Sequence, residues 1–192
     1  MALQNVNVGL AITGSYCTFE KVMPEIDKLI KAGAKVYPIL SYSASNTDTR
    51  FGTAQEFKNK LEDITHNKII DSMIDVEPIG PKGLIDVMLV APCTGNTLAK
   101  LANAITDSPV LMACKAHLRN CKPVVIAIST NDALGANAKN LGLLLNIKNI
   151  YFVPFGQDNP KDKPNSLIAK MEYLIPAIEY ALEGKQIQPL LV

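Results

Sequence analysis

One stretch of the chain, from Val87 to Asp107, constrains the fold more than any other. It begins with the apolar run Val87–Ala91, which is typical of a strand buried on both faces in a parallel sheet. Pro92 has no amide hydrogen, so we expect the strand to end there. The small polar segment Cys93–Thr97 follows, and apolar residues then recur at helical spacing. The stretch therefore predicts a buried strand, a polar loop and a helix.

The junction between this loop and its helix has two interpretations. A helix N-terminus presents free backbone N–H groups and the positive end of the helix dipole, so a ligand phosphate or carboxylate can bind there. Alternatively, Thr94 or Asn96 only caps the helix. The stretch by itself leaves both interpretations open.

The N-terminal part of the chain predicts a strand–helix–strand unit. A buried strand over Val6–Ile12 is followed by a turn with Gly14 and Ser15, by a helix that ends near Gly33, and by a second strand over Ala34–Leu40. Pro38 within the second strand indicates an edge or a bulge. The Gly-Ser turn lies where doubly wound folds bind phosphate. Because no G-x-G-x-x-G pattern is present, a mononucleotide or another small anion fits better than a dinucleotide.

The rest of the chain continues the alternation of strands and helices. The expected elements are helices over 51–64, 108–118, 134–145 and 166–183, strands over 84–91, 123–128 and 150–153, loops over 77–83 and 154–164, and an apolar tail over 186–192. Ser166 is expected to cap the last helix. We therefore predict a single α/β domain over residues 1–192, with a doubly wound, mostly parallel sheet flanked by helices. The long loop over 154–164 is interpreted as functional or as a floppy surface excursion.

Polar residues follow the carboxyl ends of at least four predicted strands. These segments are Gly14–Ser15, Ser41–Ser45, Cys93–Thr97 and Ser129–Asp132. Ligands of open α/β sheets bind in the crevice at this edge. The crevice would hold hydroxyls, amides and backbone donors but no histidine and no carboxylate pair, with Asp132 as the nearest acid. The pattern therefore predicts binding rather than acid–base chemistry, and no catalytic residue is assigned.

The composition excludes several classes of partner. The 192 residues include 19 Lys and Arg against 18 Asp and Glu, a balance that predicts neither nucleic-acid nor membrane-surface binding. Four scattered cysteines and two histidines make a metal site unexpected. Because no signal peptide or transmembrane-length run is found, we expect a reducing, cytoplasmic setting.

The central stretch also resembles a known family motif. In the flavoprotein family of FMN-dependent cysteine decarboxylases and flavin prenyltransferases, this motif reads Ala-Pro-Ala-Ser-Ala-Asn-Thr and continues with Lys, Ala, Gly and Asp. The matching positions are Ala91, Pro92, Cys93, Thr94, Gly95, Asn96, Thr97, Lys100, Ala102, Ala104 and Asp107. The resemblance extends over nearly the whole chain and implies a Rossmann-like flavoprotein fold.

The resemblance implies a site for FMN at the carboxyl edge of the sheet. The phosphate would lie on Gly14 and Ser15, near Ser41 and Thr94, while other residues would line the flavin or the substrate. The expected cofactor-binding residues are Gly14, Ser15, Ser41, Thr94, Asn96, Thr97 and Asn131. The family usually forms trimers or larger assemblies of trimers, and the apolar tail also favours a homo-oligomer.

The chain departs from the family pattern at the positions that carry chemistry. The decarboxylases have a histidine before the central strand, and no histidine lies near the equivalent Pro78. Their Pro-x-Met-Asn segment becomes Ile128–Asn131, in which only Asn131 matches. Ser129 lies where the prenyltransferases have a basic residue, and Ala104 replaces a family glycine. Neither decarboxylation nor prenylation is therefore predicted directly by these residues.

The overall likeness, including the segment Lys161–Pro164, is greatest to a branch of the family from spore-forming bacteria. Members of that branch are subunits of a synthase that makes a small pyridine dicarboxylate in the mother cell, with a partner chain that resembles an NAD(P)-dependent dehydrogenase. The resemblance thus implies one subunit of an oxidoreductase complex. Two alternatives stay open: a non-catalytic FMN- or anion-binding module that supports the partner, and a stand-alone FMN-dependent decarboxylase.

Overall fold

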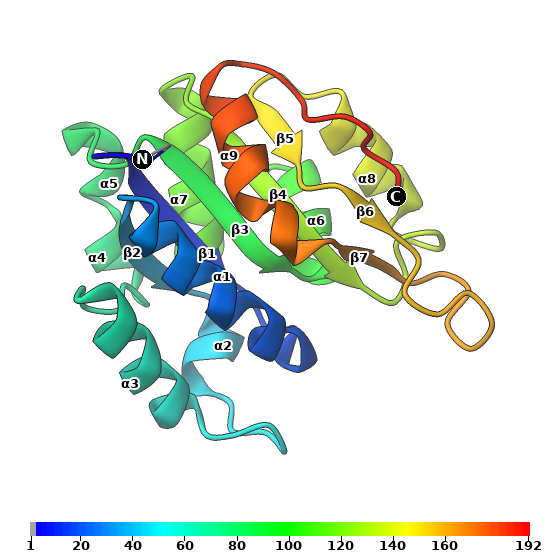
Figure 1. Cartoon of the computed structure of the whole chain (residues 1–192), viewed down its shortest axis with the longest axis horizontal. Helices are drawn as coiled ribbons and strands as arrows, with labels where there is room; N and C mark the ends of the chain where they lie inside the picture. The colour runs from blue at the N-terminus through cyan, green and yellow to red at the C-terminus, as the bar shows by residue number, and fades with distance from the viewer. Residues whose placement is uncertain (1–2) are drawn as a thin grey trace.

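A computed structural model describes residues 3–192 and contains one seven-stranded sheet (Figure 1). Five strands run parallel: β1 (Asn7–Ile12), β2 (Lys35–Leu40), β3 (Val87–Cys93), β4 (Val124–Thr130) and β5 (Ile150–Phe152). Two short strands, β6 (Phe155–Gly156) and β7 (Leu167–Ala169), are antiparallel. The order is β2-β1-β3-β4-β7-β6, and β5 pairs with β4. The predicted α/β fold with a mostly parallel sheet is confirmed.

Helices cover both faces of the sheet. The α-helices are α1 (Phe19–Lys31), α2 (Tyr42–Asn46), α3 (Ala54–Thr65), α4 (Met73–Val76), α5 (Ile79–Lys82), α6 (Gly95–Ala102), α7 (Pro109–Arg119), α8 (Ala138–Leu145) and α9 (Leu174–Leu182). Helices α1 and α9 pack on one face, and α6, α7 and α8 pack on the other (Figure 1). Because β3 lies in the middle between these layers, all seven of its residues are buried.

The N-terminal unit folds as its pattern predicts. Helix α1 ends at Lys31, and Gly33 adopts the left-handed backbone with φ +97° that a helix stop requires. Strand β2 lies at the end of the sheet. Outside β2, the amide of Ile70 donates to the Pro38 carbonyl at 2.9 Å. The proline thus lies on an edge strand, as expected.

The central strand differs from the prediction at its end. Strand β3 does not stop before Pro92 but continues to Cys93, and its register against β4 shifts between Val90 and Cys93. The irregular pairing leaves no need for an amide hydrogen at Pro92. The Pro92 carbonyl still accepts a hydrogen bond, from the Thr13 hydroxyl at 2.7 Å. Cys93, rather than Ala91, therefore lies at the carboxyl end of this central strand.

The predicted final helix over 166–183 is wrong in its first third. Leu167–Ala169 forms β7, which pairs with β4 and β6. A 3₁₀ turn, η2 (Met171–Tyr173), follows, and α9 begins only at Leu174. Ser166 therefore caps no helix. The apolar side chains of this segment suit a strand as well as a helix, and the ladder with β4 decides between them.

Two other predicted boundaries need correction. The segment 77–83 is not wholly a loop, since α5 occupies Ile79–Lys82 and ends at Gly83, which has φ +60°. Helix α8 begins at Ala138 rather than at Leu134, because Asp132–Asn137 forms a turn held by backbone hydrogen bonds from Gly135 and Asn137 to the Asp132 carbonyl.

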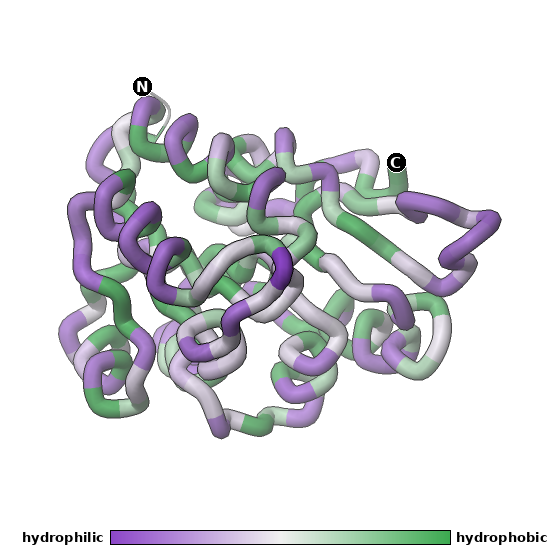
Figure 2. The backbone as a smooth tube through the Cα atoms, turned by 90° about the horizontal axis from the view of Figure 1, so that it is seen from below, coloured by the Kyte–Doolittle hydropathy of each residue, from purple (hydrophilic) through white to green (hydrophobic). Residues whose placement is uncertain are grey.

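The C-terminal tail packs on its own chain. The amide of Phe155 donates to the Leu190 carbonyl at 3.0 Å, and the amide of Val192 donates to the Phe155 carbonyl at 3.1 Å. The Gln186 side chain bonds to both backbone groups of Phe152. The tail thus extends the β6 edge. The neighbouring loop between β6 and β7 projects from the same end of the molecule and is largely hydrophilic (Figure 2).

Candidate functional site

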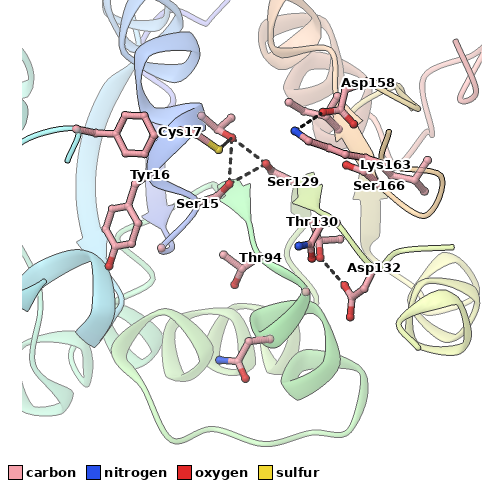
Figure 3. A pocket seen from close by; sticks show the side chains of 18 of the residues that line it. Ser15, Tyr16, Cys17, Thr94, Ser129, Thr130, Asp132, Asp158, Lys163 and Ser166 are labelled. Carbon is pink, nitrogen blue, oxygen red and sulfur yellow. Dashed lines mark hydrogen bonds and ion pairs between the residues drawn. The ribbon is translucent and has the colours of Figure 1, made fainter. Parts of the chain in front are cut away.

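A cavity of about 530 Å³ opens at the carboxyl ends of the parallel strands (Figure 3). It is lined by Gly14, Ser15, Tyr16, Cys17, Thr18, Arg50, Phe51, Thr94, Gly95, Asn96, Ser129, Thr130, Asn131, Asp132, Asp158, Lys163, Ser166, Leu167 and Ile168. These residues follow β1 and β3, lie at or after the end of β4, or belong to β7 and two longer loops. The cavity therefore occupies the place where ligands bind in doubly wound sheets.

Thr13 joins the loops that follow β1 and β3. Its hydroxyl donates to the Pro92 carbonyl at 2.7 Å and accepts from the Thr94 amide at 2.9 Å. Thr13 is almost fully buried, so water competes little for these bonds. The loops that carry Gly14 and Thr94 are thus held within the reach of one side chain.

The hydroxyls of Ser15, Thr18 and Ser129 lie within hydrogen-bond distance of one another at the cavity. We call these three side chains the hydroxyl cluster. The oxygens of Ser15 and Thr18 are 3.0 Å apart, those of Ser15 and Ser129 are 2.9 Å apart, and those of Thr18 and Ser129 are 2.8 Å apart (Figure 3). These contacts join the loop after β1 to the end of β4. They also orient the Ser15 hydroxyl next to the cavity.

Two helix starts present free donors to the same cavity. The N–H groups of Tyr16 and Cys17 open the 3₁₀ turn η1 (Tyr16–Thr18), which runs into α1, and those of Gly95 and Asn96 open α6. Among the described residues, these four N–H groups have no backbone or side-chain acceptor. The arrangement suits an anion, because both free N–H groups and helix dipoles favour negative charge.

The side chain of Thr94 caps α6, and its hydroxyl accepts from the Thr97 amide at 3.3 Å. The capping interpretation is therefore confirmed for Thr94. It does not exclude anion binding, because Thr94 serves only one of the orphan N–H groups of the first helical turn.

Asp132 belongs to a second polar group, next to Gly95. Its carboxylate accepts from the Thr130 hydroxyl at 2.5 Å and from the Asn137 amide at 2.7 Å. A Cβ atom on Gly95 would lie only 2.5–2.7 Å from atoms of these three side chains. Glycine at position 95 thus makes room for a carboxylate whose hydrogen bonds are already supplied by the protein.

The loop between β6 and β7 brings charged groups to the opposite side of the cavity. The Lys163 Nζ lies 3.7 Å from the Asp158 carboxylate (Figure 3). A hydrogen bond from Ser166 is the main cause that lowers the pKa of Asp158 below its ordinary value, and Lys163 lowers it further. Asp158 is therefore a carboxylate at neutral pH.

The structure brings most of the predicted site residues together. Gly14, Ser15, Thr94, Asn96 and Asn131 line the cavity. Ser41 and Thr97 are buried and do not line it. Ser41 caps α2, and the Thr97 hydroxyl accepts from Thr94 at 3.2 Å. These two residues thus support the neighbouring loops.

Several lining residues were missed by the sequence analysis. Thr18 lies one turn after the predicted Gly-Ser motif, and a search for further hydroxyls near that motif could have found it. Arg50, Phe51, Lys163 and Ile168 lie on loops or a short strand far from any motif. No local pattern marks them, because their place depends on how the two loops return to the sheet.

The cysteines differ in exposure: Cys93 and Cys114 are buried, whereas Cys17 and Cys121 are exposed. Cys93 is completely buried, and burial strongly raises the pKa of its thiol. Cys93 is thus a small buried residue of β3. Burial also raises the pKa of Cys114 to about 12. Cys17 lines the cavity and is exposed.

The described part of the chain, residues 3–192, contains no cluster of three or more metal-ligating side chains and no helix long and apolar enough to cross a membrane. Within it, the cavity offers hydroxyls, amides, free N–H groups and two cations, while Asp132 is engaged by its neighbours. This set of groups can bind and orient a polar, negatively charged ligand.

Comparison with known proteins places this chain in a family. The family model described as Flavoprotein matches residues 1–175. The chain is 52% identical over 191 residues to the B chain of dipicolinate synthase from Bacillus subtilis (strain 168), with 100% of this chain and 96% of that protein covered.

Solved structures agree with this relationship. The crystal structure of the dipicolinate synthase B chain from Bacillus halodurans C has a TM-score of 0.92 and 54% identity, and covers 100% of this chain and 98% of its own. Burkholderia xenovorans DmrB in complex with FMN has a TM-score of 0.62 at 18% identity, over 78% and 88% of the two chains, and shares the fold. The chain belongs to the flavoprotein family.

Proposed function

We propose that this chain is the B chain of a dipicolinate synthase, an enzyme subunit within an oxidoreductase complex. The observation that carries the proposal is the similarity along the entire chain to two proteins of that name, at 52% and 54% identity. The complex forms dipicolinate from a dihydro- or hydroxytetrahydro-dipicolinate during sporulation. The partner is an A chain that resembles a dehydrogenase and carries NAD(P), and both chains work in the cytoplasm of the mother cell.

The cavity fits FMN as its cofactor. A phosphate can accept from the free N–H groups of Tyr16, Cys17, Gly95 and Asn96, next to the Ser15 hydroxyl. Gly14 lets the turn after β1 pack closely against Ser43, because a Cβ atom there would lie 2.9 Å from the Ser43 hydroxyl oxygen. The family match to flavoproteins supports this choice. Bound flavin supplies hydride and electron transfer, the chemistry that conversion of a dihydropyridine to an aromatic pyridine requires.

In this mechanism the chain's own residues bind the phosphate and orient the substrate. The N–H groups at the two helix starts hold the phosphate. Thr18 and Ser129, the other members of the hydroxyl cluster, fix the Ser15 hydroxyl beside it. The amides of Asn96 and Asn131 line the cavity and donate to a substrate carboxylate, a hydrogen bond strengthened by the charge. Asp132 is engaged by hydrogen bonds from Thr130 and Asn137, so it is assigned no proton transfer.

A second candidate is a non-catalytic module that binds FMN or an anion and supports the A chain. It is favoured by the hydrogen bonds that engage Asp132 and by the lack of a histidine among the cavity residues. A stand-alone decarboxylase is the third candidate. It is less well supported, because Pro78 lies where the decarboxylases carry their histidine.

Dipicolinate formation, followed by its ultraviolet absorbance, separates these candidates. The proposal predicts turnover only when this chain, the A chain and NAD(P) are combined, and dependence of the rate on FMN bound to this chain. Equal rates with FMN-loaded and FMN-free protein would support the module. Steady turnover by this chain alone, without pyridine nucleotide, would contradict the need for a partner.

We also propose that the chain forms a homo-oligomer, a trimer or a multiple of it. Large apolar side chains remain exposed on the single chain, among them Ile74 at 84% and Leu191 at 73%. Such side chains favour association. Light scattering at working concentration should give a mass well above 20.8 kDa, and a monomer mass would contradict the proposal.

A further inference from the structure

Four charged side chains line the cavity: Arg50, Asp132, Asp158 and Lys163. They differ in how far the protein already satisfies them. Asp132 accepts hydrogen bonds from two neighbours, and the carboxylate of Asp158 lies 3.7 Å from the ammonium group of Lys163. The two cations are the groups that remain available for an anionic ligand.

The ammonium group of Lys163 has hydrogen-bond donors that the protein does not use. Its Nζ lies 3.7 Å from the Asp158 carboxylate, which is an ion pair but is too long for a hydrogen bond. Within residues 3–192, its Nζ makes no hydrogen bond. An ammonium group has three N–H donors. The Asp158 carboxylate therefore attracts the lysine without using its donors.

The loop that carries Lys163 has a defined structure of its own. The Lys163 amide donates to the Asn159 carbonyl at 2.8 Å, and the Ser166 amide donates to the Lys163 carbonyl at 3.0 Å. The Gln157 side chain donates to the Pro164 carbonyl at 2.8 Å. These bonds fold the loop back on itself, while most of its residues remain exposed. They place Lys163 beside the cavity before any ligand arrives.

The sheet order places the two cations at different ends of the cavity. Arg50 lies between α2 and α3, beyond β2, and Lys163 lies between β6 and β7. Strands β2 and β6 are the two ends of the path β2-β1-β3-β4-β7-β6. The β1 side carries Gly14, Ser15 and Thr18, whereas Ser129, the third member of the hydroxyl cluster, lies in β4, two residues before Asn131. A phosphate thus suits the Arg50 end, and a second anion suits the Lys163 end.

We propose that Lys163 is a specificity-determining residue that binds one carboxylate of the dicarboxylate substrate. This inference rests on the proposed function, which supplies the substrate class. Charge-assisted hydrogen bonds from an ammonium group to a carboxylate are among the stronger ones in proteins. The lysine selects a second carboxylate on the ring, so a ring with one carboxylate binds more weakly.

The test uses two probes, pyridine-2,6-dicarboxylate and pyridine-2-carboxylate, titrated calorimetrically into the FMN-loaded full chain. Wild type should bind the dicarboxylate more tightly. In Lys163→Gln, dicarboxylate affinity should fall about tenfold to a hundredfold, and the preference for two carboxylates should shrink. Lys163→Arg should retain most of the affinity. The losses from removing the lysine and from removing the carboxylate should be non-additive, as they are for groups in contact.

Two variants act as controls. Lys161→Gln makes the same change on an exposed residue of the same loop outside the cavity lining, and should bind both probes as wild type does. Arg50→Gln removes a charge from the other end of the cavity. It should lower dicarboxylate affinity much less than Lys163→Gln. An equal loss would overturn the proposed contact between Lys163 and the carboxylate, because it would mean that any positive charge at the cavity has the same effect.

The remaining outcomes separate this inference from the proposed function. If wild type binds the dicarboxylate and Lys163→Gln binds it equally well, the role of Lys163 is wrong and the proposed function stands. If folded, FMN-loaded wild type does not bind the dicarboxylate, the proposed substrate class fails, and the inference fails with it. Binding of FMN by Lys163→Gln, measured by flavin absorbance, shows that the variant is folded.

Discussion

The two ends of the cavity differ in how their polar groups are held. At one end, Ser15, Thr18 and Ser129 bond to one another and carry no charge. At the other, Asp158 and Lys163 are charged, and the lysine side chain is 58% exposed. The first end is formed by the turn after β1 and by Ser129 near the end of β4, and the second belongs to a loop between two short antiparallel strands. The comparison separates a fixed anchor from a more exposed recognition surface.

The largest expected effect comes from placing a negative charge at the first end. Ser15→Asp should weaken FMN binding at least about a hundredfold, because a carboxylate would lie next to the phosphate position in a partly buried site. Ser15→Ala, which removes only the hydroxyl, should cost much less. Ser108→Asp is the matched control, since Ser108 caps α7 outside the cavity and aspartate is also a good cap. Unchanged FMN affinity in Ser15→Asp would contradict the anchor.

His117 should make the stability of the folded chain depend on pH, and this limits the pH range in which the two ends of the cavity can be compared. Among residues 3–192, its buried Nε2 has no hydrogen-bond partner. Burial lowers the pKa of His117 from 6.5 to about 4, and Lys122 lowers it further. The unfolded chain therefore binds more protons between these values, so stability falls as pH falls through this window, by about 3 kcal/mol in full.

Chemical unfolding from pH 7 to pH 4 measures this loss. His117→Leu should have a weaker pH dependence, whereas His66→Gln, at an exposed position, should behave as wild type. If the leucine variant does not fold, an NMR titration of His117 in wild type gives the same answer. A histidine that titrates near 6.5 would contradict the effect of burial.

A change at the boundary between the two ends should be of intermediate size. Gly95→Ala would place a Cβ atom 2.5–2.7 Å from Thr130, Asp132 and Asn137, and overpacking of this kind costs about 1–3 kcal/mol. Urea unfolding should show the loss. Gly142→Ala is the control: it lies in α8 with no atom within 4 Å of the added methyl, and should be neutral or stabilising. Equal effects of the two changes would contradict the packing around Gly95.

The smallest expected effect concerns the second end. Ser166→Ala removes the hydrogen bond that most lowers the pKa of Asp158, so this pKa should rise toward its ordinary value. Lys163 still neutralises the carboxylate, so dicarboxylate affinity should change less than tenfold. An NMR titration of the Asp158 carboxyl group gives the pKa, and no upward shift would contradict the hydrogen bond.

The same contrast explains what the sequence predicts. Gly14, Ser15 and Thr94 could be placed at one site, because each directly follows a strand with a clear apolar run and parallel strands end at the same edge. Gly33 likewise marked the end of α1 correctly. These features depend on local pattern and on the topology of the sheet.

The features that could not be predicted depend on contacts between distant segments. Pro92 lies inside β3 because the register shifts there, and Leu167–Ala169 forms a strand because β4 offers an edge. Both choices are made by a partner strand, which a local pattern does not contain. Lys163 belongs to the loop 154–164, which the sequence marked as a functional candidate, but its place beside the cavity depends on the pairing of β7.

The most direct test of this account is a titration of FMN into the folded, FMN-free chain and two of its variants, followed by flavin absorbance and fluorescence. The account predicts saturable binding of one FMN per chain by wild type, loss of binding in Ser15→Asp, and retention in Lys163→Gln. No saturable binding by wild type, or equal binding by Ser15→Asp, would contradict the claim that the first end of the cavity anchors the flavin phosphate.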